Sequence, residues 1–252
     1  MTGVLDGKTA LVIGGSSGIG NAIAHGFRES GARVAIAART PSKVEAAIAR
    51  LQEQDSGAKG YVADVSRPDE IARLADAVLG DLGHLDVLVV SQGTTLLKPA
   101  EEFSPAEYDA IMDVNMRSVF FSCTYFGRHM LTRGEGAIIT IASLAAHRGW
   151  PGSAVYAVSK HGVAGLTQSL AAEWAGRGVR VNAISPGFFM TELNQARMSA
   201  ERKENALRRT PMRRFGRLDE LVGAAVYLAS PAASFVTGSI LNVDGGYLAA
   251  GI

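Results

Sequence analysis

The sequence predicts an α/β protein: a single doubly wound, Rossmann-type domain with a seven-stranded parallel sheet flanked by helices. Short apolar runs without polar alternation are typical of parallel strands buried on both faces. Helical patterns separate these runs at the spacing of βαβ units, and a glycine-rich turn follows the first run. No linker, repeat or break in composition divides the chain, so we expect one domain over residues 1–252.

The expected strands cover residues 9–13, 33–38, 60–63, 85–90, 136–142, 179–185 and 240–243. The expected helices cover residues 18–30, 41–54, 66–82, 104–131, 153–176 and 218–229. Pro41 suits a first helical turn, and Ser104 with Glu107 resembles a capping box. Residues 186–216 are less regular and rich in Arg and Met. A segment of this length behind a strand is typical of a lid, which we place at about residues 188–215.

Composition narrows the choice of partners and compartment. The net charge of +1 gives no reason to expect nucleic acid or an anionic membrane as a partner. The chain has neither a signal-peptide core nor an apolar stretch of membrane-spanning length, so a cytoplasmic protein is expected. The one cysteine, Cys123, excludes an intrachain disulfide and is expected in the core. No His/Cys/Asp cluster indicates a metal site. We interpret a basic cluster as a solvated or subunit-facing surface: Arg208, Arg209, Arg213, Arg214 and Arg217.

Tyr156 and Lys160 stand four residues apart on an expected helix, so their side chains share one face. A phenol with a pKa of about 10 exchanges protons poorly near neutral pH. A neighbouring ammonium favours the phenolate and lowers that pKa, which would make the pair a general acid/base. The same spacing is common on helix surfaces, so the interpretation depends on which residues surround the pair.

Those residues are sought after each strand, because ligands of doubly wound folds bind beyond the carboxyl ends of the strands. The glycine-rich turn at residues 14–20 would let a pyrophosphate approach the backbone at a helix N-terminus. After the second strand stands Arg39, where an NAD site needs an acidic residue. A guanidinium suits a 2′-phosphate, which favours NADP(H) and leaves NAD(H) possible; the alternative is a solvated surface arginine.

The later strand ends carry further candidates. Asp64 could accept a hydrogen bond from an adenine amino group or serve as a turn residue. Gly93 would let the backbone lie against a cofactor. Asn115, inside an apolar helix, could hold a water, mark a backbone kink or be purely structural. Ser143 follows the fifth strand, and Pro186, Gly187 and Thr191 follow the sixth.

Taken together, these residues resemble the short-chain dehydrogenase/reductase family over essentially the whole chain. The family's Thr-Gly-x-x-x-Gly-x-Gly loop matches residues 13–20, and its later motifs match Asn182, Pro186-Gly187, Thr191 and residues 244–246. Its catalytic Asn, Ser, Tyr and Lys match Asn115, Ser143, Tyr156 and Lys160. The chain departs from the family at Ile13, where Thr is usual, and at residues 90–93, where Val-Ser-Gln-Gly replaces Asn-Asn-Ala-Gly. We expect these departures to alter cofactor affinity or loop rigidity and to leave activity intact.

The resemblance implies a role for each matched residue. Tyr156 would exchange a proton with the substrate oxygen, and Ser143 would hydrogen-bond that oxygen. Lys160 would lower the Tyr156 pKa, and Asn115 would position a water for proton relay. The expected cofactor contacts are Gly14, Ser16, Ser17, Gly18, Ile19, Gly20, Arg39, Asp64, Val65, Ser91, Gly93, Tyr156, Lys160, Pro186, Gly187, Phe189 and Thr191. The expected substrate contacts are Ser143, Ala145, His147, Trp150, Tyr156 and Phe188, with Thr94, Thr95, Met190 and Leu193 beside them.

The resemblance also implies an activity. The C-terminal third is similar to family members that interconvert sugar acids and keto-sugar acids, such as gluconate 5-dehydrogenase, and to 3-oxoacyl-carrier-protein reductases. We expect an NADP(H)-dependent oxidoreductase that interconverts a secondary alcohol and a ketone on a sugar, polyol or sugar acid. A thioester reductase and a non-enzymatic NADP(H)-binding scaffold are the alternatives. By the same resemblance, helices 104–131 and 153–176 would pair across a twofold axis in a homodimer or homotetramer.

Overall fold

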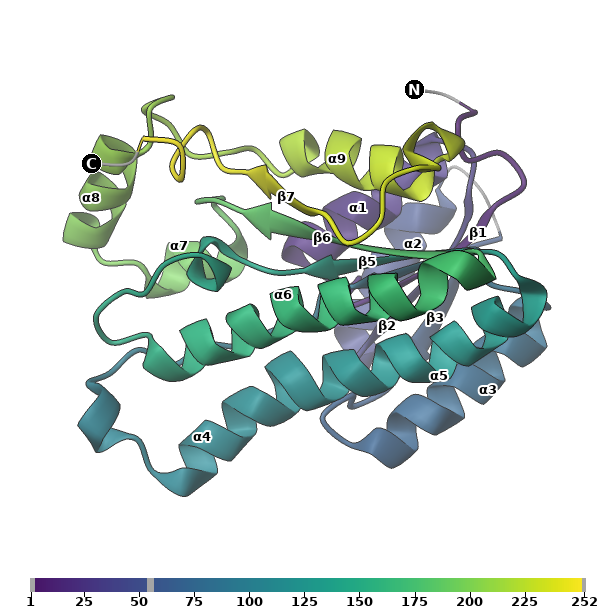
Figure 1. Cartoon of the computed structure of the whole chain (residues 1–252), viewed down its shortest axis with the longest axis horizontal. Helices are drawn as coiled ribbons and strands as arrows, with labels where there is room; N and C mark the ends of the chain where they lie inside the picture. Colours follow the sequence, from purple (N-terminus) through teal and green to yellow (C-terminus); the bar gives the residue numbers. More distant parts are fainter. Residues whose placement is uncertain (1–2, 54–56, 251–252) are drawn as a thin grey trace.

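Seven parallel strands form one sheet in a computed structural model that describes residues 3–53 and 57–250. The strand order is β3-β2-β1-β4-β5-β6-β7 (Figure 1). The strands are β1 (Thr9–Ile13), β2 (Arg33–Ala38), β3 (Lys59–Val62), β4 (Val87–Val90), β5 (Gly136–Ile141), β6 (Val179–Pro186) and β7 (Ile240–Val243). The predicted doubly wound parallel sheet is confirmed.

The order of the strands reverses at β1, which pairs with β2 on one side and with β4 on the other. In register, Ile13 at the end of β1 lies between Ala37 and Val90. Loops leave β1 and β4 toward opposite faces of the sheet, so a crevice opens at their carboxyl ends. A ligand in this crevice would contact the turns that follow β1, β2 and β4.

Helices cover both faces of the sheet (Figure 1). On one face lie α1 (Gly18–Glu29), α2 (Pro41–Gln52) and α9 (Asp219–Ala229), which share a core with alternate residues of the strands. On the other face lie α3 (Pro68–Leu82), α5 (Ser118–Arg133) and α6 (Ala154–Trp174). Short 3₁₀ turns occur at Ala100–Glu102, Leu144–Ala146, Ala175–Arg177 and Pro231–Ala233. The predicted helices are found within a few residues; the predicted end of the second, Gln54, lies outside the described residues.

The long helix predicted over residues 104–131 is interrupted. It consists of α4 (Pro105–Met112), a π-helix (Asp113–Arg117) and α5. The predicted capping box is present: Glu107 N donates to Ser104 Oγ over 3.3 Å, and Ser104 N donates to Glu107 Oε2 over 2.9 Å. The π-helix has the buried Asn115 at its centre. Single π-helical turns inside α-helices are frequently found at functional sites.

The segment expected to be irregular contains two short helices, α7 (Glu192–Arg197) and α8 (Ala200–Arg209), at the carboxyl end of the sheet (Figure 1). Each begins with a hydroxyl cap. Thr191 Oγ1 accepts from Asn194 N, and Ser199 Oγ accepts from Arg202 N, both over 3.2 Å. Thr and Ser are common N-cap residues, so the signal for both helices was present in the sequence.

The core and surface bear on the other expectations from composition. Cys123 is buried among core residues, as predicted, and burial raises the pKa of its thiol to about 12. Across residues 3–53 and 57–250, no helix is long and apolar enough to cross a membrane. The same residues contain no group of three or more His, Cys, Asp or Glu side chains placed to hold a metal ion.

Candidate active site

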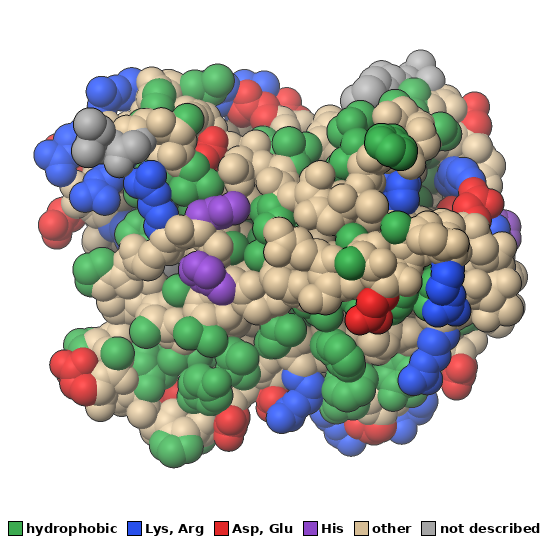
Figure 2. Space-filling view, in the orientation of Figure 1, with side chains coloured by type: hydrophobic (Ala, Val, Ile, Leu, Met, Phe, Trp, Pro, Cys, Tyr) green, Lys and Arg blue, Asp and Glu red, His purple; other side chains and the backbone are tan. Residues whose placement is uncertain are grey.

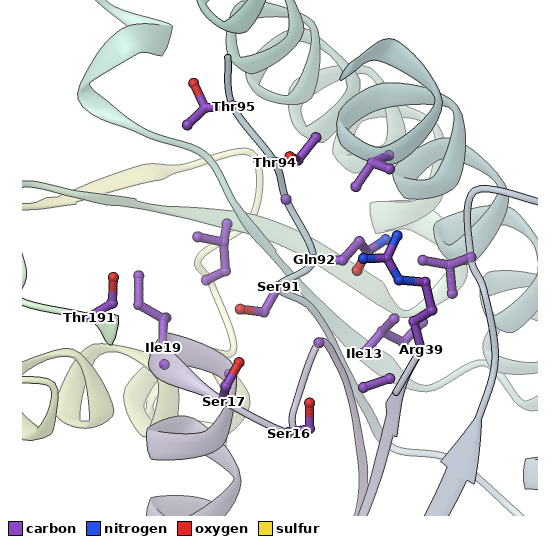
Figure 3. A pocket seen from close by; sticks show the side chains of 18 of the residues that line it. Ile13, Ser16, Ser17, Ile19, Arg39, Ser91, Gln92, Thr94, Thr95 and Thr191 are labelled. Atoms are coloured by element: carbon purple, nitrogen blue, oxygen red, sulfur yellow. The ribbon is translucent and has the colours of Figure 1, made fainter. Parts of the chain in front are cut away.

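A cavity of about 440 Å³ opens beyond the carboxyl ends of β1, β2, β4 and β5 (Figure 3). Its lining includes every predicted cofactor residue except Phe189. These residues are Gly14, Ser16, Ser17, Gly18, Ile19, Gly20, Arg39, Asp64, Val65, Ser91, Gly93, Tyr156, Lys160, Pro186, Gly187 and Thr191. The strand-end positions chosen from the sequence therefore come together in one hollow.

The glycine-rich turn brings backbone to the surface of this cavity. Gly14 has φ +81°, a left-handed conformation that favours glycine, and a Cβ atom there would lie 2.8 Å from Gln92 N. A Cβ atom on Gly20 would lie 2.4 Å from the Gly14 carbonyl oxygen. No side-chain cap from Ser17 occupies the start of α1, and the first turn of α1 carries no acidic residue. The backbone N–H groups there suit a pyrophosphate.

Basic side chains gather where α2 begins. Arg39 and Lys43 flank the first turn of α2, and both line the cavity together with Ser16 and Thr40. In Figure 3 the Arg39 side chain extends from the end of β2 toward the segment that carries Gln92. Neither cation has an ion pair with any residue that the structure describes. Sequence reasoning missed Lys43, although its place one turn into the helix after Arg39 was a usable signal.

Gln92 provides a test of whether the cavity suits a dinucleotide. Its Nε2 donates to Ser118 Oγ over 2.8 Å, whereas its Oε1 is buried without a hydrogen-bond partner among the described residues. A buried acceptor that lines a cavity calls for a donor, and a nucleotide's ribose hydroxyls or amino group would supply one. Asp64 has the predicted turn role, because its Oδ1 accepts from Ser66 N and Oγ, and it also lines the cavity.

Phe189, whose backbone was expected to contact the cofactor, is outside the lining of this cavity. Its side chain is buried in the core against Gly216, where a Cβ atom would lie 2.3 Å from the ring. Its carbonyl oxygen accepts from Asn194 Nδ2 over 2.8 Å and from Thr191 N over 3.0 Å. The aromatic ring is drawn into the core, and the carbonyl is already engaged by the start of α7. Phe189 therefore supports Thr191, which does line the cavity.

A second cavity, of about 700 Å³, adjoins the first. Residues that line both cavities are Thr95, Ser143, Tyr156, Pro186, Gly187 and Asn194. Of the predicted substrate residues, Ser143, Trp150, Tyr156 and Phe188 line the second cavity. A molecule in one cavity therefore meets a molecule in the other beside the hydroxyl groups of Ser143 and Tyr156.

Ala145 and His147, predicted to contact substrate, are absent from the lining of both cavities. They belong to the 3₁₀ turn that follows Ser143. Ala145 is fully buried beneath Ser143, with its N–H donating to Ser143 Oγ over 3.1 Å, and His147 is exposed. Ala145 and His147 were predicted from their position between Ser143 and Tyr156. That position did not reveal the direction in which their side chains point. Met190 also lies outside both linings, and the side chain of Leu193 lies outside the described part of the structure.

Tyr156, Ser143 and Lys160 form the chemical centre. The hydroxyl groups of Tyr156 and Ser143 line the same two cavities. Lys160 is buried; its Nζ donates to the Ile141 carbonyl over 2.8 Å and lies 5.9 Å from the centre of the Tyr156 ring. Burial lowers the pKa of Lys160 to about 8. Burial raises the pKa of Tyr156, while the neighbouring Ser143 hydroxyl and the charge of Arg202 act to lower it.

Lys160, which was expected to lower the Tyr156 pKa, is not among the groups that shift it in this structure. The spacing placed both residues on one face, but the ammonium points at the Ile141 carbonyl, and removal of the phenol from water outweighs the charges near it. In this structure Tyr156 keeps its proton at neutral pH. It can therefore donate a proton to an oxygen in the cavity.

Asn115 acts on the loop after β4. Its Nδ2 donates to the Thr94 carbonyl over 2.8 Å and to Ser159 Oγ over 3.1 Å, and its Oδ1 accepts from Thr94 N over 2.8 Å. The amide is fully buried, and both its nitrogen and its oxygen are hydrogen-bonded to protein. The backbone kink that was one of the alternatives raised by the sequence is present as a π-helix.

The far wall of the second cavity comes from α8 and from three aromatic rings. Tyr247 lies 5.4 Å from the ring of Phe188 and 6.4 Å from that of Trp150, measured between ring centres. Sequence reasoning missed Tyr247. Arg208 and Arg209 are exposed, in keeping with their interpretation as a solvated surface, and they also line this cavity together with Arg202 and Asn205. That they border the cavity was not predicted.

Comparison with known proteins places the chain among oxidoreductases. Residues 13–248 match the family model described as Enoyl-(Acyl carrier protein) reductase. D-threitol dehydrogenase of Mycolicibacterium smegmatis is 42% identical, with 96% of this chain and 94% of that protein covered. A 3-oxoacyl-acyl-carrier-protein reductase of Thermotoga maritima is 33% identical, with 96% and 98% covered. The structure of a gluconate 5-dehydrogenase from Burkholderia cenocepacia, in complex with NADP and tartrate, is 37% identical with a TM-score of 0.93, covering 97% and 96%.

These relatives share the reaction class more closely than the substrate. The match extends over nearly the full length of both chains in each case. The chain belongs to the short-chain dehydrogenase/reductase family and is an NAD(P)-dependent oxidoreductase that acts on CH–OH groups.

Proposed function

We propose that the protein is an NADP(H)-dependent dehydrogenase that interconverts a secondary alcohol and a ketone on a sugar, polyol or sugar acid. The observation that carries this proposal is the meeting of the two cavities at Tyr156 and Ser143. The first cavity has the size and lining for a dinucleotide, and the second has a polar lining suited to a small hydroxylated substrate. Similarity to a threitol dehydrogenase and a gluconate 5-dehydrogenase supports the substrate class.

The proposed chemistry divides between cofactor and protein. A bound nicotinamide cofactor supplies or accepts the hydride. Tyr156 transfers the proton at the substrate oxygen: its pKa is raised above the ordinary value by burial, so it carries the proton that ketone reduction needs. Ser143, which lines both cavities with Tyr156, stabilises the charge that develops on the oxygen. Lys160 holds a positive charge behind Tyr156 at neutral pH, and its bond to Ile141 fixes the turn of α6 that carries the phenol.

The preference for NADP(H) rests on the basic end of the first cavity. Arg39 and Lys43 together supply two positive charges beside Ser16 and Thr40, and no acidic side chain of β2 opposes a 2′-phosphate. The gluconate 5-dehydrogenase structure with NADP supports the same preference. NAD(H) remains a weaker substrate under this proposal, because the glycine turn and Gln92 would serve either dinucleotide.

The lid and the assembly state complete the proposal. Residues 188–215, which include α7 and α8, form the lid over the second cavity of a cytoplasmic enzyme.

Tyr108, Phe120 and Val158 on α4, α5 and α6 are 42%, 41% and 55% exposed, and Figure 2 shows hydrophobic side chains gathered over these helices. Pairing of two copies through this face would cover them. Light scattering is expected to give a dimer or tetramer mass; a monomer at micromolar concentration would contradict the pairing.

The first prediction concerns activity and Tyr156. A panel of gluconate, threitol, galactitol and an acetoacetyl thioester with both cofactors is expected to show turnover of sugars or sugar acids, faster with NADP(H). Tyr156→Phe should lower kcat by about 100- to 10,000-fold, since proton transfer is lost, with NADPH affinity retained. Tyr227→Phe, on the exposed face of α9, is the control. Thioester reduction without sugar turnover, or full activity in Tyr156→Phe, would contradict the proposal.

The second prediction concerns the buried charge of Lys160. Its pKa is lowered from 10.5 to about 8, so the folded protein below pH 8 holds a disfavoured ammonium. Between pH 8 and 10.5 the unfolded chain binds a proton that the folded chain has lost, so wild-type stability rises with pH there. Lys160→Met should raise the free energy of unfolding at pH 7 by up to about 3 kcal/mol, reduced by loss of the bond to Ile141.

Urea unfolding of wild type and Lys160→Met at several pH values measures this effect, with Lys203→Met as the control for a lysine that is not fully buried. The stability gain should shrink as the pH rises from 8 to 10.5, while the variant has lost activity. A destabilised variant at pH 7, or a gain independent of pH, would show that the ammonium is well accommodated.

The third prediction concerns cofactor choice. Arg39→Ala is expected to raise the KM for NADPH by about 10- to 100-fold, because a charge-assisted contact to the 2′-phosphate is removed. Lys43→Ala should have a smaller effect in the same direction, and neither should change the KM for NADH. Arg33→Ala, at the opposite end of the same strand, is the matched control. An unchanged NADPH KM in the Arg39 and Lys43 variants would refute the proposed phosphate site.

A further inference from the structure

Helix α8 turns a charged face toward the second cavity. Arg202, Asn205, Ala206 and Arg209 follow one another at helical spacings of three and four residues, and all line the cavity. A short helix over a cavity commonly turns apolar residues inward. Here Lys203, on another side of α8, is outside the lining, whereas the arginines are part of it. Arg202 and Arg209 are exposed and line the cavity, so both can reach a molecule that it holds.

The charges on this face lack protein counter-charges. Arg202 and Arg209 have no side-chain hydrogen bond or ion pair with any residue in the ranges 3–53 and 57–250. Arg208 donates to the neutral Asn205 Oδ1 over 2.9 Å. Glu201 is the one acidic residue among the cavity's described lining residues, against the three arginines Arg202, Arg208 and Arg209. Unpaired like charges around a concave surface focus positive potential and attract an anion.

Arg202 on this face acts electrostatically on the reacting group, Tyr156. The charge of Arg202 acts on the Tyr156 hydroxyl and lowers its pKa, in opposition to the larger effect of burial. Tyr156 and Ser143 line the same cavity as Arg202. A molecule in this cavity can therefore present an anionic group to α8 and an alcohol or ketone carbon to Tyr156.

The wall between these ends is aromatic. Trp150, Phe188 and Tyr247 line the cavity and contact one another as rings. Aromatic faces pack well against the C–H groups of a hydroxylated carbon chain, while hydroxyl groups are left to polar neighbours. The cavity thus has a proton-exchanging end, an aromatic wall and a cationic end.

We propose that Arg202 and Arg209 bind the carboxylate of the substrate and make the enzyme a sugar-acid dehydrogenase rather than a polyol dehydrogenase. This inference rests on the proposed function and specifies its substrate. A guanidinium with free N–H groups binds a carboxylate through two parallel hydrogen bonds, which a neutral terminal hydroxyl cannot reproduce. A short acyl thioester has no carboxylate on its acyl chain. Its apolar chain would leave both arginines without a counter-charge.

The test compares matched acids and alcohols in wild type and Arg202→Gln. Threonate, gluconate and galactonate are paired with threitol, glucitol and galactitol, which differ from them by the carboxylate. Wild type is expected to prefer the acids. Arg202→Gln should raise the KM for the preferred acid by about 10- to 100-fold and change the KM for its alcohol by less than about threefold. Arg202→Lys should give an intermediate KM, and Lys203→Gln, which removes one charge from the same helix, should behave as wild type.

Calorimetric binding of the acids to the NADP⁺-loaded protein separates this inference from the proposed function. If wild type oxidises the alcohols but not the acids, or if Arg202→Gln affects acid and alcohol equally, the carboxylate site is refuted and the proposed function stands. If no compound is oxidised but acid binding weakens about 10-fold or more in Arg202→Gln, the site is supported and the proposed reaction fails. If no acid is oxidised or bound and the thioester is reduced, both are refuted.

Discussion

The hydrogen bond from the buried Lys160 ammonium to the Ile141 carbonyl fixes the position of the reacting groups. Ile141 ends β5 and precedes Ser143 by two residues, while Lys160 lies one helical turn beyond Tyr156. One contact therefore sets α6 against the carboxyl end of β5 and brings the two hydroxyl groups together. The arrangement is costly, because burial disfavours the ammonium and lowers the Lys160 pKa to about 8; at neutral pH the group still carries its positive charge.

Side-chain hydrogen bonds hold the loop after β4 in place, as the Lys160 bond holds α6. The Asn115 amide is hydrogen-bonded to both the N–H and the carbonyl of Thr94, and Gln92 Nε2 donates to Ser118 Oγ on α5. Gln92 stands in the segment where the family's usual Asn-Asn-Ala-Gly is replaced. The loop thus has its own attachment to the helix layer, and the Gln92 oxygen remains available on the cavity side. The π-helix around Asn115 is the local distortion that accompanies this attachment.

The sequence predicted features that depend on local periodicity and on strand ends. Buried apolar runs identified the sheet, and parallel strands necessarily deliver the residues after them to one edge, so Gly14, Arg39, Asp64 and Ser143 were found in one place. Features set by tertiary packing were missed. The direction of the His147 side chain depends on the 3₁₀ turn before it. The position of the Phe189 ring depends on the space beside Gly216. Which residues of α8 line the second cavity depends on how that helix packs beside the cavity. The Tyr156 pKa depends on burial, which residue spacing does not reveal.

The shared boundary of the two cavities has an evolutionary consequence. Arg39 and Lys43 line the first cavity alone, and Arg202 and Arg209 line the second alone; the residues common to both include the two reacting hydroxyl groups. If the second cavity holds the substrate, as proposed, mutations in α8 or in the aromatic wall could change what is oxidised while the residues that line only the first cavity stay the same. Divergence of chemistry would need changes at the edge of the sheet. Relatives of similar overall sequence can thus differ in substrate while one reaction persists.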